Sequence, residues 1–258
     1  MLDLSKITIK NFKYFESVSS TNDIILEMAK NGAEEYSCCF AEEQAKGRGR
    51  LERVWQTYPY KSLAFSFVLY NFQEVIPLVL CCSLHTVLKN KFQSNVVIKW
   101  PNDIYFNECK LSGILVESYP VQSSKRAYIV GIGLNVFAED DKLDMVGFLE
   151  DATDIAISRE ELLNNLFKQI KEDIANLQKN GFGQFKDYFM QNCLYLNQQI
   201  SVNLHNKVES GEFVGINDSG YLILKQKEVI LNIPAGQIVQ KKWINGHNKR
   251  IYTNSNIW

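Results

Sequence analysis

The stretch "NVVIKWPNDIYFNECKLSGILVESY", residues 95–119, decides the fold of this chain. Turn-forming residues at 101–103 and 107–108 separate three runs rich in β-branched, aromatic and aliphatic side chains. This pattern predicts a strand, a turn, a second strand, a second turn and a third strand. The run that follows, "RAYIVGIGLNVF" at 126–137, predicts a further strand. We therefore expect a β-sheet at the centre of the chain.

Three segments around this region have helical patterns. Residues 19–32 predict a helix with Ser20 as N-cap, Asp23 as its capping-box partner and Gly32 at its end. Residues 74–92 are apolar on most sides and predict a buried helix with a proline in its first turns. Residues 158–181 alternate with a helical period and predict an amphipathic helix.

Two more strands are expected upstream, in "YSCCFAEEQ" at 36–44 and in "SLAFSFVLY" at 62–70, where Leu63, Phe65, Phe67 and Leu69 share one face. The mixture of helices and strands predicts an α+β fold.

The sequence changes character after about residue 195. Residues 198–240 contain only short alternating runs, separated by Asn-Asp-Ser-Gly and Pro-Ala-Gly turns. Several short strands at close spacing predict a small β-barrel or sandwich. We therefore expect a large domain at 1–195, a small β domain at 196–242 and a loosely held polar tail at 243–258.

The composition excludes several classes of protein. The 258 residues carry 28 Lys and Arg against 29 Asp and Glu, a balance that argues against a dedicated nucleic-acid binder. No signal peptide is apparent, and no stretch has the about 20 apolar residues of a membrane helix. The six cysteines match neither a zinc pattern nor a disulfide framework, so we expect a reduced, cytoplasmic protein.

The loop "QAKGRGRLERVW", residues 44–55, is the first candidate site. Glycines let backbone N–H groups approach a ligand, and each arginine offers a planar fork for phosphate or carboxylate. The spacing of Arg48, Arg50 and Arg53 predicts two guanidinium groups on one side of the loop and a third beyond them. This arrangement suits a compact anion such as a nucleotide triphosphate, although a solvated turn explains an isolated loop equally well.

Two further stretches contain candidate residues. Lys110 precedes the apolar residues Leu111, Ile114 and Val116, and an ammonium group in a buried sheet needs an anionic partner. That partner is either Asp103 or the carboxylate or phosphate of a ligand. The "SSTN" at 19–22 is either a helix cap alone or a helix N-terminus that also binds a small polar ligand.

In this order and at this spacing, "SSTN", "QAKGRGRLERVW", "KWPNDIYFNECKLSGILVE" and "GIGLNV" resemble the motifs of the biotin protein ligases. The resemblance covers most of residues 12–137, and the β-rich end resembles the SH3-like domain of that family. It implies a mixed β-sheet flanked by helices, followed by a small barrel. One residue departs from the pattern Gly-Arg-Gly-Arg-x-Gly-Arg-x-Trp, because Glu52 replaces its last glycine.

The resemblance implies a two-step reaction. The carboxylate of biotin attacks the α-phosphate of ATP, and a lysine of a biotin carboxyl carrier protein then attacks the resulting biotinyl-5′-adenylate. Mg²⁺ is expected to accompany ATP, with no metal-ligating residue assigned in the chain. Lys110 and Arg48 are the implied catalytic residues, and Asp103 is implied to orient Lys110 or to assist with the metal or the incoming lysine.

Motif matching also assigns the binding residues. The implied biotin-binding residues are Ser20, Thr21, Asn22, Gln44, Gly47, Arg48, Gly49, Arg50, Lys110 and Gly113. The implied ATP- and adenylate-binding residues are Arg48, Arg50, Arg53, Trp55, Asn102, Lys110 and Asn135.

Several alternatives remain open at the level of sequence. A lipoate ligase shares the catalytic fold, and a relic that binds biotin without catalysis is a further alternative. A nucleic-acid binder would show repeated Arg-Gly units, whereas this chain has one. Because "SSTN" begins at residue 19, we expect no DNA-binding domain of about 60 residues before it and no repressor function. The chain is expected to be a monomer or a homodimer.

Overall fold

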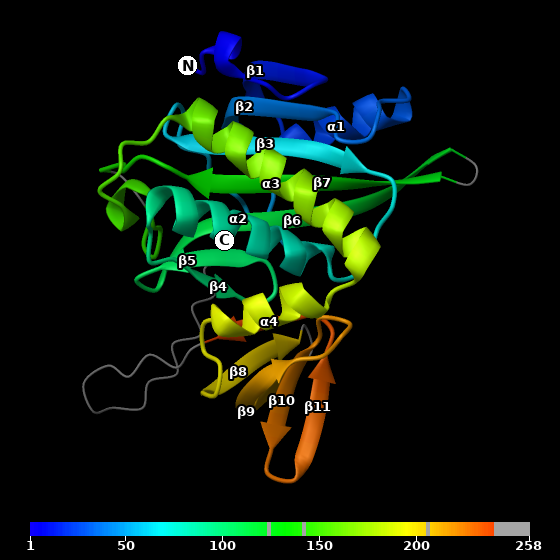
Figure 1. Ribbon diagram of the computed structural model, residues 1–258, viewed down its shortest axis with the longest axis vertical. Helices are drawn as coiled ribbons and strands as arrows, with labels where there is room; N and C mark the ends of the chain where they lie inside the picture. Colours follow the sequence, from blue (N-terminus) through cyan, green and yellow to red (C-terminus); the bar gives the residue numbers. More distant parts are fainter. Residues whose placement is uncertain (123–124, 141–142, 205–206, 240–258) are drawn as a thin grey trace.

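The computed structural model describes residues 1–122, 125–140, 143–204 and 207–239. Its main feature is a seven-stranded sheet with the order β1-β2-β3-β7-β6-β5-β4 (Figure 1). Strands β1 and β2 are parallel, and every other neighbouring pair is antiparallel, so the sheet is mixed. The strands are β1 (Phe12–Val18), β2 (Cys38–Gln44), β3 (Ser62–Leu69), β4 (Val97–Lys99), β5 (Asp103–Phe106), β6 (Cys109–Gln122) and β7 (Lys125–Asn135).

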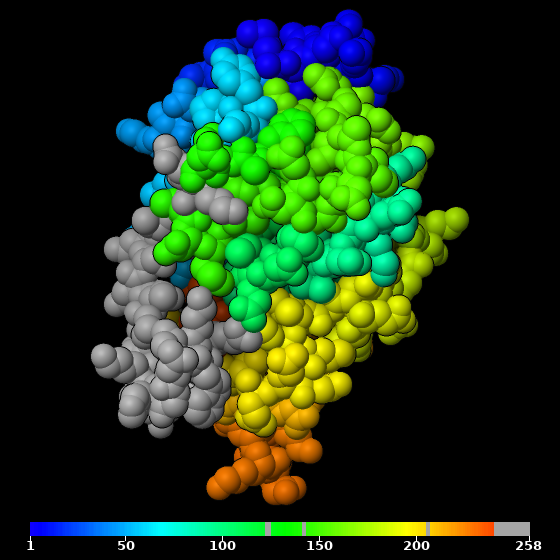
Figure 2. Space-filling model, turned by 90° about the vertical axis from the view of Figure 1, so that its left-hand side faces the viewer, coloured from blue at the N-terminus to red at the C-terminus, as the bar shows by residue number. Residues whose placement is uncertain are grey.

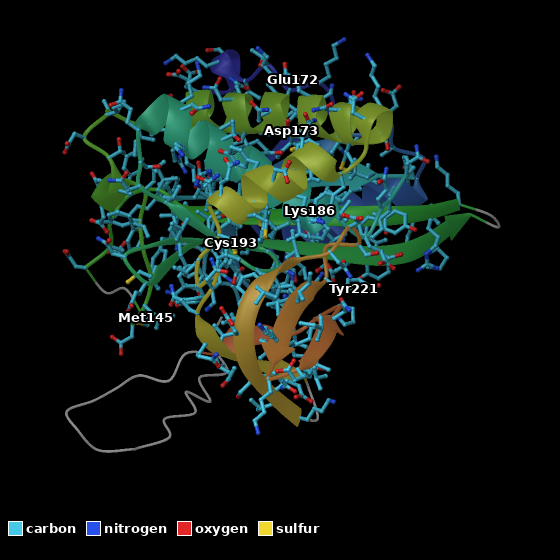
Figure 3. The ribbon with its side chains drawn as sticks, turned by 60° about the horizontal axis from the view of Figure 1, so that its bottom comes forward. Met145, Glu172, Asp173, Lys186, Cys193 and Tyr221 are labelled. Atoms are coloured by element: carbon cyan, nitrogen blue, oxygen red, sulfur yellow. The ribbon has the colours of Figure 1, made fainter. Side chains whose placement is uncertain are left out.

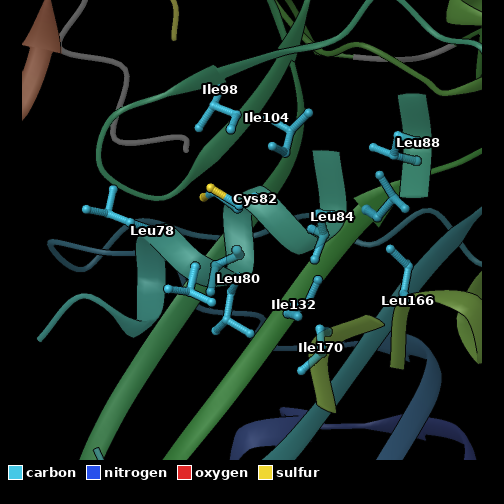
Figure 4. Packing of buried hydrophobic residues seen from close by; sticks show 14 of the residues in the cluster. Leu78, Leu80, Cys82, Leu84, Leu88, Ile98, Ile104, Ile132, Leu166 and Ile170 are labelled. Carbon is cyan, nitrogen blue, oxygen red and sulfur yellow. The ribbon is translucent and has the colours of Figure 1, made fainter. Parts of the chain in front are cut away.

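Helices cover both faces of this sheet. On one face, α2 and α3 pack over a large core that includes Leu84, Ile132 and Ile170 (Figure 4). On the other face, α1 packs against β3 and β7 over a smaller cluster that contains Ile25 and Val68. The helices are α1 (Thr21–Lys30), α2 (Ile76–Phe92), α3 (Arg159–Asn180) and α4 (Gly183–Gln191), with 3-10 turns at Leu4–Lys6 and Glu150–Ala152.

A second, antiparallel sheet of five strands follows α4, in the order β11-β10-β9-β8-β12. It forms a small lobe at one end of the molecule (Figure 2). The α+β fold with a mixed, helix-flanked sheet and a small C-terminal β domain is thereby confirmed, and the predicted tail at 243–258 lies outside the described residues. The strands are β8 (Gln199–Leu204), β9 (Lys207–Ile216), β10 (Leu222–Gln226), β11 (Val229–Ile233) and β12 (Gln237–Val239).

The two sheets are joined by specific contacts. The chain leaving α4 pairs with the edge of β4, since Ile98 N–H donates to Asn192 O and Leu194 N–H donates to Ile98 O, at 2.9 and 2.8 Å. The buried Trp100 donates its indole N–H to Gly220 O in the turn before β10, at 3.0 Å. Figure 3 shows Cys193 and Tyr221 on the side of the small sheet that faces the large one. The small domain therefore touches the β4–β5 hairpin directly.

The signals at the helix ends are only partly confirmed. Ser158 caps the start of α3, because the Glu161 N–H donates to its hydroxyl. Ser20 occupies the N-cap position of α1, but its side chain makes no capping hydrogen bond. The predicted capping box at Ser20 and Asp23 is wrong, because the Asp23 carboxylate pairs with Arg48 instead.

A buried ion pair ties α3 to the large sheet. Arg159 donates from Nη1 and Nη2 to the two carboxylate oxygens of Glu42, at 2.6 and 3.0 Å, and both side chains are almost fully buried. Arg159 also donates to Ser62 O, and the Leu2 N–H donates to Glu42 Oε1. The start of the chain, β2, β3 and α3 therefore meet at one charged pair.

All six cysteines are free. Cys38, Cys39, Cys81 and Cys82 are buried and act as small apolar side chains, in keeping with their apolar neighbours in the sequence. Burial raises the pKa of each of these four thiols above its ordinary value. None of the helices in the described residues has the length and hydrophobicity that crossing a bilayer requires.

We expect His85 to make the fold sensitive to acid. This residue of α2 is buried, accepts from the Tyr188 hydroxyl through Nδ1 at 2.8 Å and donates from Nε2 to Val96 O at 3.0 Å. Burial lowers the pKa of His85 from 6.5 to about 4. Because the pKa is lower in the folded than in the unfolded state, protonation of His85 favours unfolding. The free energy of unfolding is therefore expected to decrease by about 3 kcal/mol as the pH falls from 6.5 to 4. Urea unfolding at a series of pH values measures this slope.

The matched variant is His85→Gln, whose amide offers one donor and one acceptor but does not titrate in this range. Its free energy of unfolding is expected to fall less steeply below pH 6.5 than that of the parent chain. Parallel pH profiles for the two proteins would show that other groups govern acid unfolding.

Candidate functional site

Small residues form the part of the α1 face of the large sheet on which the candidate site lies. Alternation along the strands directs Leu63, Phe65 and Phe67 to the α2 face and leaves Ala64 and Ser66 on the α1 face. On β7 the α1 face presents Gly131 and Gly133 in the same way. A Cβ at Gly131 would lie 2.4 Å from Asn22 Oδ1, and a Cβ at Gly133 would lie 2.2 Å from the indole of Trp55. Glycine at these two positions therefore lets polar and aromatic side chains lie directly on the sheet.

The N-terminus of α1 forms one wall of the site. Gln44 Oε1 accepts from both the backbone N–H and the hydroxyl of Thr21, at 2.9 and 3.0 Å. The Ser66 hydroxyl donates to Asn22 Oδ1 at 2.6 Å, and Asn22 Nδ2 donates to Glu117 at 2.6 Å. Ser20, Thr21 and Asn22 are all buried. Thr21, Asn22 and Gln44 of the predicted site are thus joined in one hydrogen-bonded group, and Ser20 lies buried beside them.

The arginine loop forms a short hairpin over the site. Arg48 and Val54 form a β-bridge, and the N–H of Gly49 donates to Arg53 O at 2.7 Å. The two residues at its tip, Leu51 and Glu52, have φ angles of 56° and 61°. Glycine adopts such angles at least cost, so Glu52 holds the left-handed conformation at the position where the related motif has glycine. The replacement is accommodated within the turn.

The three arginines of this hairpin point to different partners. Arg48 donates to Asp23 at 2.7 Å and to Glu117 at 3.2 Å, and the hydrogen bonds to Asp23 raise the pKa of its guanidinium. Arg50 donates to Asn102 Oδ1 at 2.9 Å and to Gly236 O. The expectation of two guanidinium groups on one side with Arg53 beyond is therefore wrong. Arg48 bridges α1 and β6, whereas Arg50 reaches the small domain.

Arg53 continues this contact with the small domain, since it donates to Gln237 Oε1 at the start of β12. Arg50 and Arg53 thus lie together between the hairpin and β12, away from the carboxylates that hold Arg48.

Lys110 and Asp103 form an ion pair in the middle of the site. Lys110 Nζ lies 2.8 Å from Asp103 Oδ1, and the two side chains are 14% and 18% exposed. Of the two partners left open by the sequence, the structure therefore supplies the carboxylate within the chain. The Lys110 ammonium also lies 5.7 Å from the centroid of the Trp55 ring. Gly113 makes room beside it, because a Cβ there would lie 3.0 Å from Lys110 Nζ.

Two buried donors in the described residues, Trp55 Nε1 and Asn135 Nδ2, have no hydrogen-bond partner. Trp55 is 6% exposed and Asn135 is fully buried. A buried donor without a partner is unfavourable, and a bound ligand is one way to satisfy it. Asn102 is satisfied, since it donates to Ile114 O at 2.6 Å and accepts from Arg50.

Sequence reasoning missed four residues of the site. Ser66 and Glu117 complete the group around Asn22, Thr57 accepts from Gln44, and Gln237 receives Arg53. Glu117 offered a signal, because it is a carboxylate at the end of the apolar run "LSGILVE". The other three are ordinary polar residues that only the fold brings close.

The site combines a polar wall at α1, a floor without side chains and fixed positive charge at Lys110, Arg50 and Arg53. Such a site can hold two anionic groups close together and stabilise charge that develops between them. Gly47 and Gly49 lie where the hairpin closes, and the carbonyl of Gly47 accepts from the Trp55 N–H at 2.9 Å. Within the described ranges, no group of three or more His, Cys, Asp or Glu side chains is placed to hold a metal ion.

Comparisons with known proteins bear on this site. Residues 14–135 match the Biotin/lipoate A/B protein ligase family, and residues 195–241 match the Biotin protein ligase C terminal domain. The chain is 31% identical over 224 residues to Biotin--protein ligase 2 of Arabidopsis thaliana, covering 80% of this chain and 67% of that protein. It is 29% identical to a Biotin--[acetyl-CoA-carboxylase] ligase of Paracoccus denitrificans, covering 85% and 96%.

A similar solved structure is that of the biotin protein ligase from Aquifex aeolicus in complex with biotin and ATP. Its TM-score is 0.77 at 30% identity, over 89% of this chain and 98% of that one. The similarity includes both sheets, so it extends beyond the four motifs.

Proposed function

This chain belongs to the biotin protein ligase family, and we propose that the site on the α1 face is where it performs that family's reaction. The enzyme activates biotin with ATP to biotinyl-5′-adenylate and transfers the biotinyl group to a lysine of a biotin carboxyl carrier protein. The observation that carries the residue assignment is the ordered Lys110–Asp103 pair, which lies among the small residues of the floor and beside Trp55.

In the first step, a carboxylate oxygen of biotin forms a bond with the α-phosphorus, and pyrophosphate leaves with the electron pair of the broken P–O bond. We assign the polar fused ring of biotin to the wall made by Ser20, Thr21, Asn22 and Gln44. Its carboxylate then extends towards Lys110, whose ammonium stabilises charge on carboxylate and phosphate. Arg50 reaches the same region from the hairpin.

The adenosine is assigned to the end of the site opposite the wall at α1. The Trp55 ring offers a flat face for adenine, and the unpaired Asn135 Nδ2 offers a donor. Asn102 positions Arg50, and Arg53 approaches from the side of the small domain. We assign Arg48 a positioning role, because Asp23 and Glu117 occupy its guanidinium and Glu117 also holds Asn22.

In the second step, the amine of the carrier lysine attacks the carbonyl carbon of the anhydride, and AMP leaves. The carrier lysine must first lose a proton to become nucleophilic. Asp103 is the carboxylate beside Lys110, so it is our candidate for guiding the incoming amine.

Mg²⁺ fits this site as a companion of the phosphates. The carboxylates of Asp103 and Glu117 already pair with Lys110 and Arg48. The protein would therefore supply Mg²⁺ with one ligand at most, and Asp103 is the candidate. Mg²⁺ prefers such sites, with phosphate and water oxygens supplying the remaining ligands. It would neutralise charge on the phosphate tail.

ATP–pyrophosphate exchange, with biotin or lipoate supplied separately, tests the proposed function. We expect exchange with biotin and none with lipoate. Exchange with lipoate alone would keep the chemistry and replace the substrate. Absence of exchange with either acid, in a chain that still binds biotin, would show that the site has lost catalysis.

Two glycines on one strand allow the two halves of the site to be separated. Gly133→Ala places a methyl group about 2.2 Å from the Trp55 indole and is expected to raise the KM for ATP by about tenfold or more. Gly131→Ala places it 2.4 Å from Asn22 Oδ1 and is expected to raise the KM for biotin instead. Steady-state exchange kinetics on both variants measure the two constants. Equal effects of both substitutions on both substrates would contradict the assignment.

We further propose a domain boundary near residue 195, with the large domain at 1–195 and the small one at 196–242. Positive φ angles at Tyr195 and Asn197, between α4 and β8, support a chain reversal there. We also propose a cytoplasmic location, no binding to nucleic acid and a monomeric or dimeric state. The six free cysteines support the first of these, and the net charge of −1 supports the second.

A further inference from the structure

Three cations and one carboxylate gather near the edge of the large sheet, at β4, β5 and β6. Lys99 lies opposite Asp103 in the β4–β5 register, and Lys110 lies opposite Tyr105 in the β5–β6 register. Paired residues in neighbouring strands extend to the same face, so these side chains share the face that carries the Lys110–Asp103 pair. Arg53 adds a third positive charge from the hairpin. The group therefore carries more positive than negative charge.

Lys99, unlike Lys110, has no carboxylate partner of its own. Lys99 Nζ donates to the Tyr105 hydroxyl at 3.3 Å, and it lies 4.6 and 5.9 Å from the ring centroids of Tyr105 and Tyr195. Asp103 gives its short contact to Lys110. Throughout the ranges that the structure describes, no carboxylate lies within ion-pair distance of Lys99. The rings of two tyrosines, one of which also offers its hydroxyl, thus surround a partly buried ammonium.

Such surroundings disfavour the charged form of lysine. Burial lowers the pKa of Lys99 to about 8, and the positive charges of Lys110 and Arg53 lower it as well. The negative charge of Asp103 opposes this shift without cancelling it. A cation–π contact with tyrosine offsets part of this cost but not the loss of water. An anion bound beside Lys99 would offset the remainder, so the position suits a negatively charged ligand.

The order of the strands indicates which anion this is. Helix α1, where we place biotin, contacts β2, β3, β6 and β7, whereas Lys99 lies on β4 at the far edge of the sheet. In a phosphoryl-centre displacement the attacking and leaving oxygens lie roughly in line on opposite sides of phosphorus. If the carboxylate approaches from the α1 side, then the leaving group departs towards β4. Lys110 lies between the two, beside the α-phosphate.

We propose that Lys99 binds the pyrophosphate portion of ATP and stabilises pyrophosphate as it leaves. The proposal rests on the proposed function and adds to it a site for the leaving group. The bond between the carboxylate oxygen and the α-phosphorus forms, and the bond to the bridging oxygen breaks. Pyrophosphate takes the electron pair, and Lys99 supplies charge and a hydrogen bond without transferring a proton.

The experiment compares the full chain with Lys99→Met and Lys99→Arg, using inorganic pyrophosphate as the probe. In ATP–pyrophosphate exchange with biotin, Lys99→Met is expected to raise the KM for pyrophosphate by about tenfold or more. Lys99→Arg keeps the charge and is expected to stay within about threefold of the parent chain. The KM for biotin is expected to remain unchanged in both variants.

A matched control separates binding from folding. Lys171 of α3 has its Nζ 5.1 Å from the centroid of the Tyr36 ring. Lys171→Met therefore removes a similar lysine–tyrosine contact far from the site. It is expected to leave every constant unchanged. If Lys99→Met does not fold, then Lys99→Gln, which keeps a polar group near Tyr105, replaces it in the same assay.

Two results would overturn the proposal. One is an unchanged KM for pyrophosphate in a folded Lys99 variant. The other is normal exchange with a slowed transfer from preformed biotinyl-5′-adenylate to the carrier, which would assign Lys99 to the incoming amine. Failure of exchange in the parent chain would instead count against the proposed function, so the two failures are distinguishable.

Discussion

Lys110→Met is expected to lower the rate of biotin-dependent ATP–pyrophosphate exchange by about 10²–10³-fold, the effect of removing one preorganised charge donor. The ion pair with Asp103 at 2.8 Å holds the ammonium in place before any substrate arrives. Stabilisation of this kind needs no reorganisation during the reaction, so its loss appears chiefly in kcat. Initial rates of exchange at saturating biotin and ATP measure the effect.

Methionine leaves the partly buried Asp103 without its ion-pair partner, which by itself disturbs the site. The double variant Lys110→Met with Asp103→Asn removes both charges and separates this effect from catalysis. We expect the double variant to be as slow as Lys110→Met, although more stable to urea. Exchange within about tenfold of the parent rate in either variant would remove Lys110 from the chemistry.

The largest change in stability is expected from the buried pair of Glu42 and Arg159. Glu42→Gln leaves the guanidinium of Arg159 without its counter-charge and is expected to lower the free energy of unfolding by about 3–5 kcal/mol. The cost is large because the two side chains are only 1% and 6% exposed. Urea unfolding at pH 7, followed by circular dichroism, measures it.

Two variants act as controls for this measurement. Glu42→Leu with Arg159→Met removes both charges and is expected to cost much less than Glu42→Gln, since apolar residues often replace a buried pair at little cost. Lys168→Ala breaks the exposed contact with Glu172 at 3.9 Å and is expected to change stability by less than about 1 kcal/mol. A cost for Glu42→Gln as small as that of Lys168→Ala would show that water reaches the pair.

The sequence predicts most of the regular elements of the fold, because these depend on local pattern, although it does not predict α4. The strand–turn–strand reading of 95–119 is confirmed by β4, β5 and β6, and the helix at 158–181 is confirmed by α3. Burial of the paired cysteines follows from their apolar neighbours. In each case the prediction depends only on residues that are close together in the sequence.

Contacts between distant residues were not predictable in this way. Arg48 meets Asp23 and Glu117, which are 25 and 69 positions away, and Arg50 meets Gly236 at a separation of 186. The loop pattern predicts that these arginines bind anions, but it does not predict where each guanidinium points. The surrounding sheet and the small domain determine that direction. The failed capping box at Ser20 has the same cause, since a distant arginine outcompetes a local backbone donor for Asp23.

The pairing of the α4 exit with β4 has a consequence for how this protein can change. The connector between the two domains is itself hydrogen-bonded to the strand that leads to Asn102 and Asp103. Trp100, in the same hairpin, donates to the small domain. A foreign barrel grafted after residue 195 would therefore replace a support of the catalytic hairpin. Recombination at this boundary should yield working ligases only when the graft brings its own acceptor for Trp100.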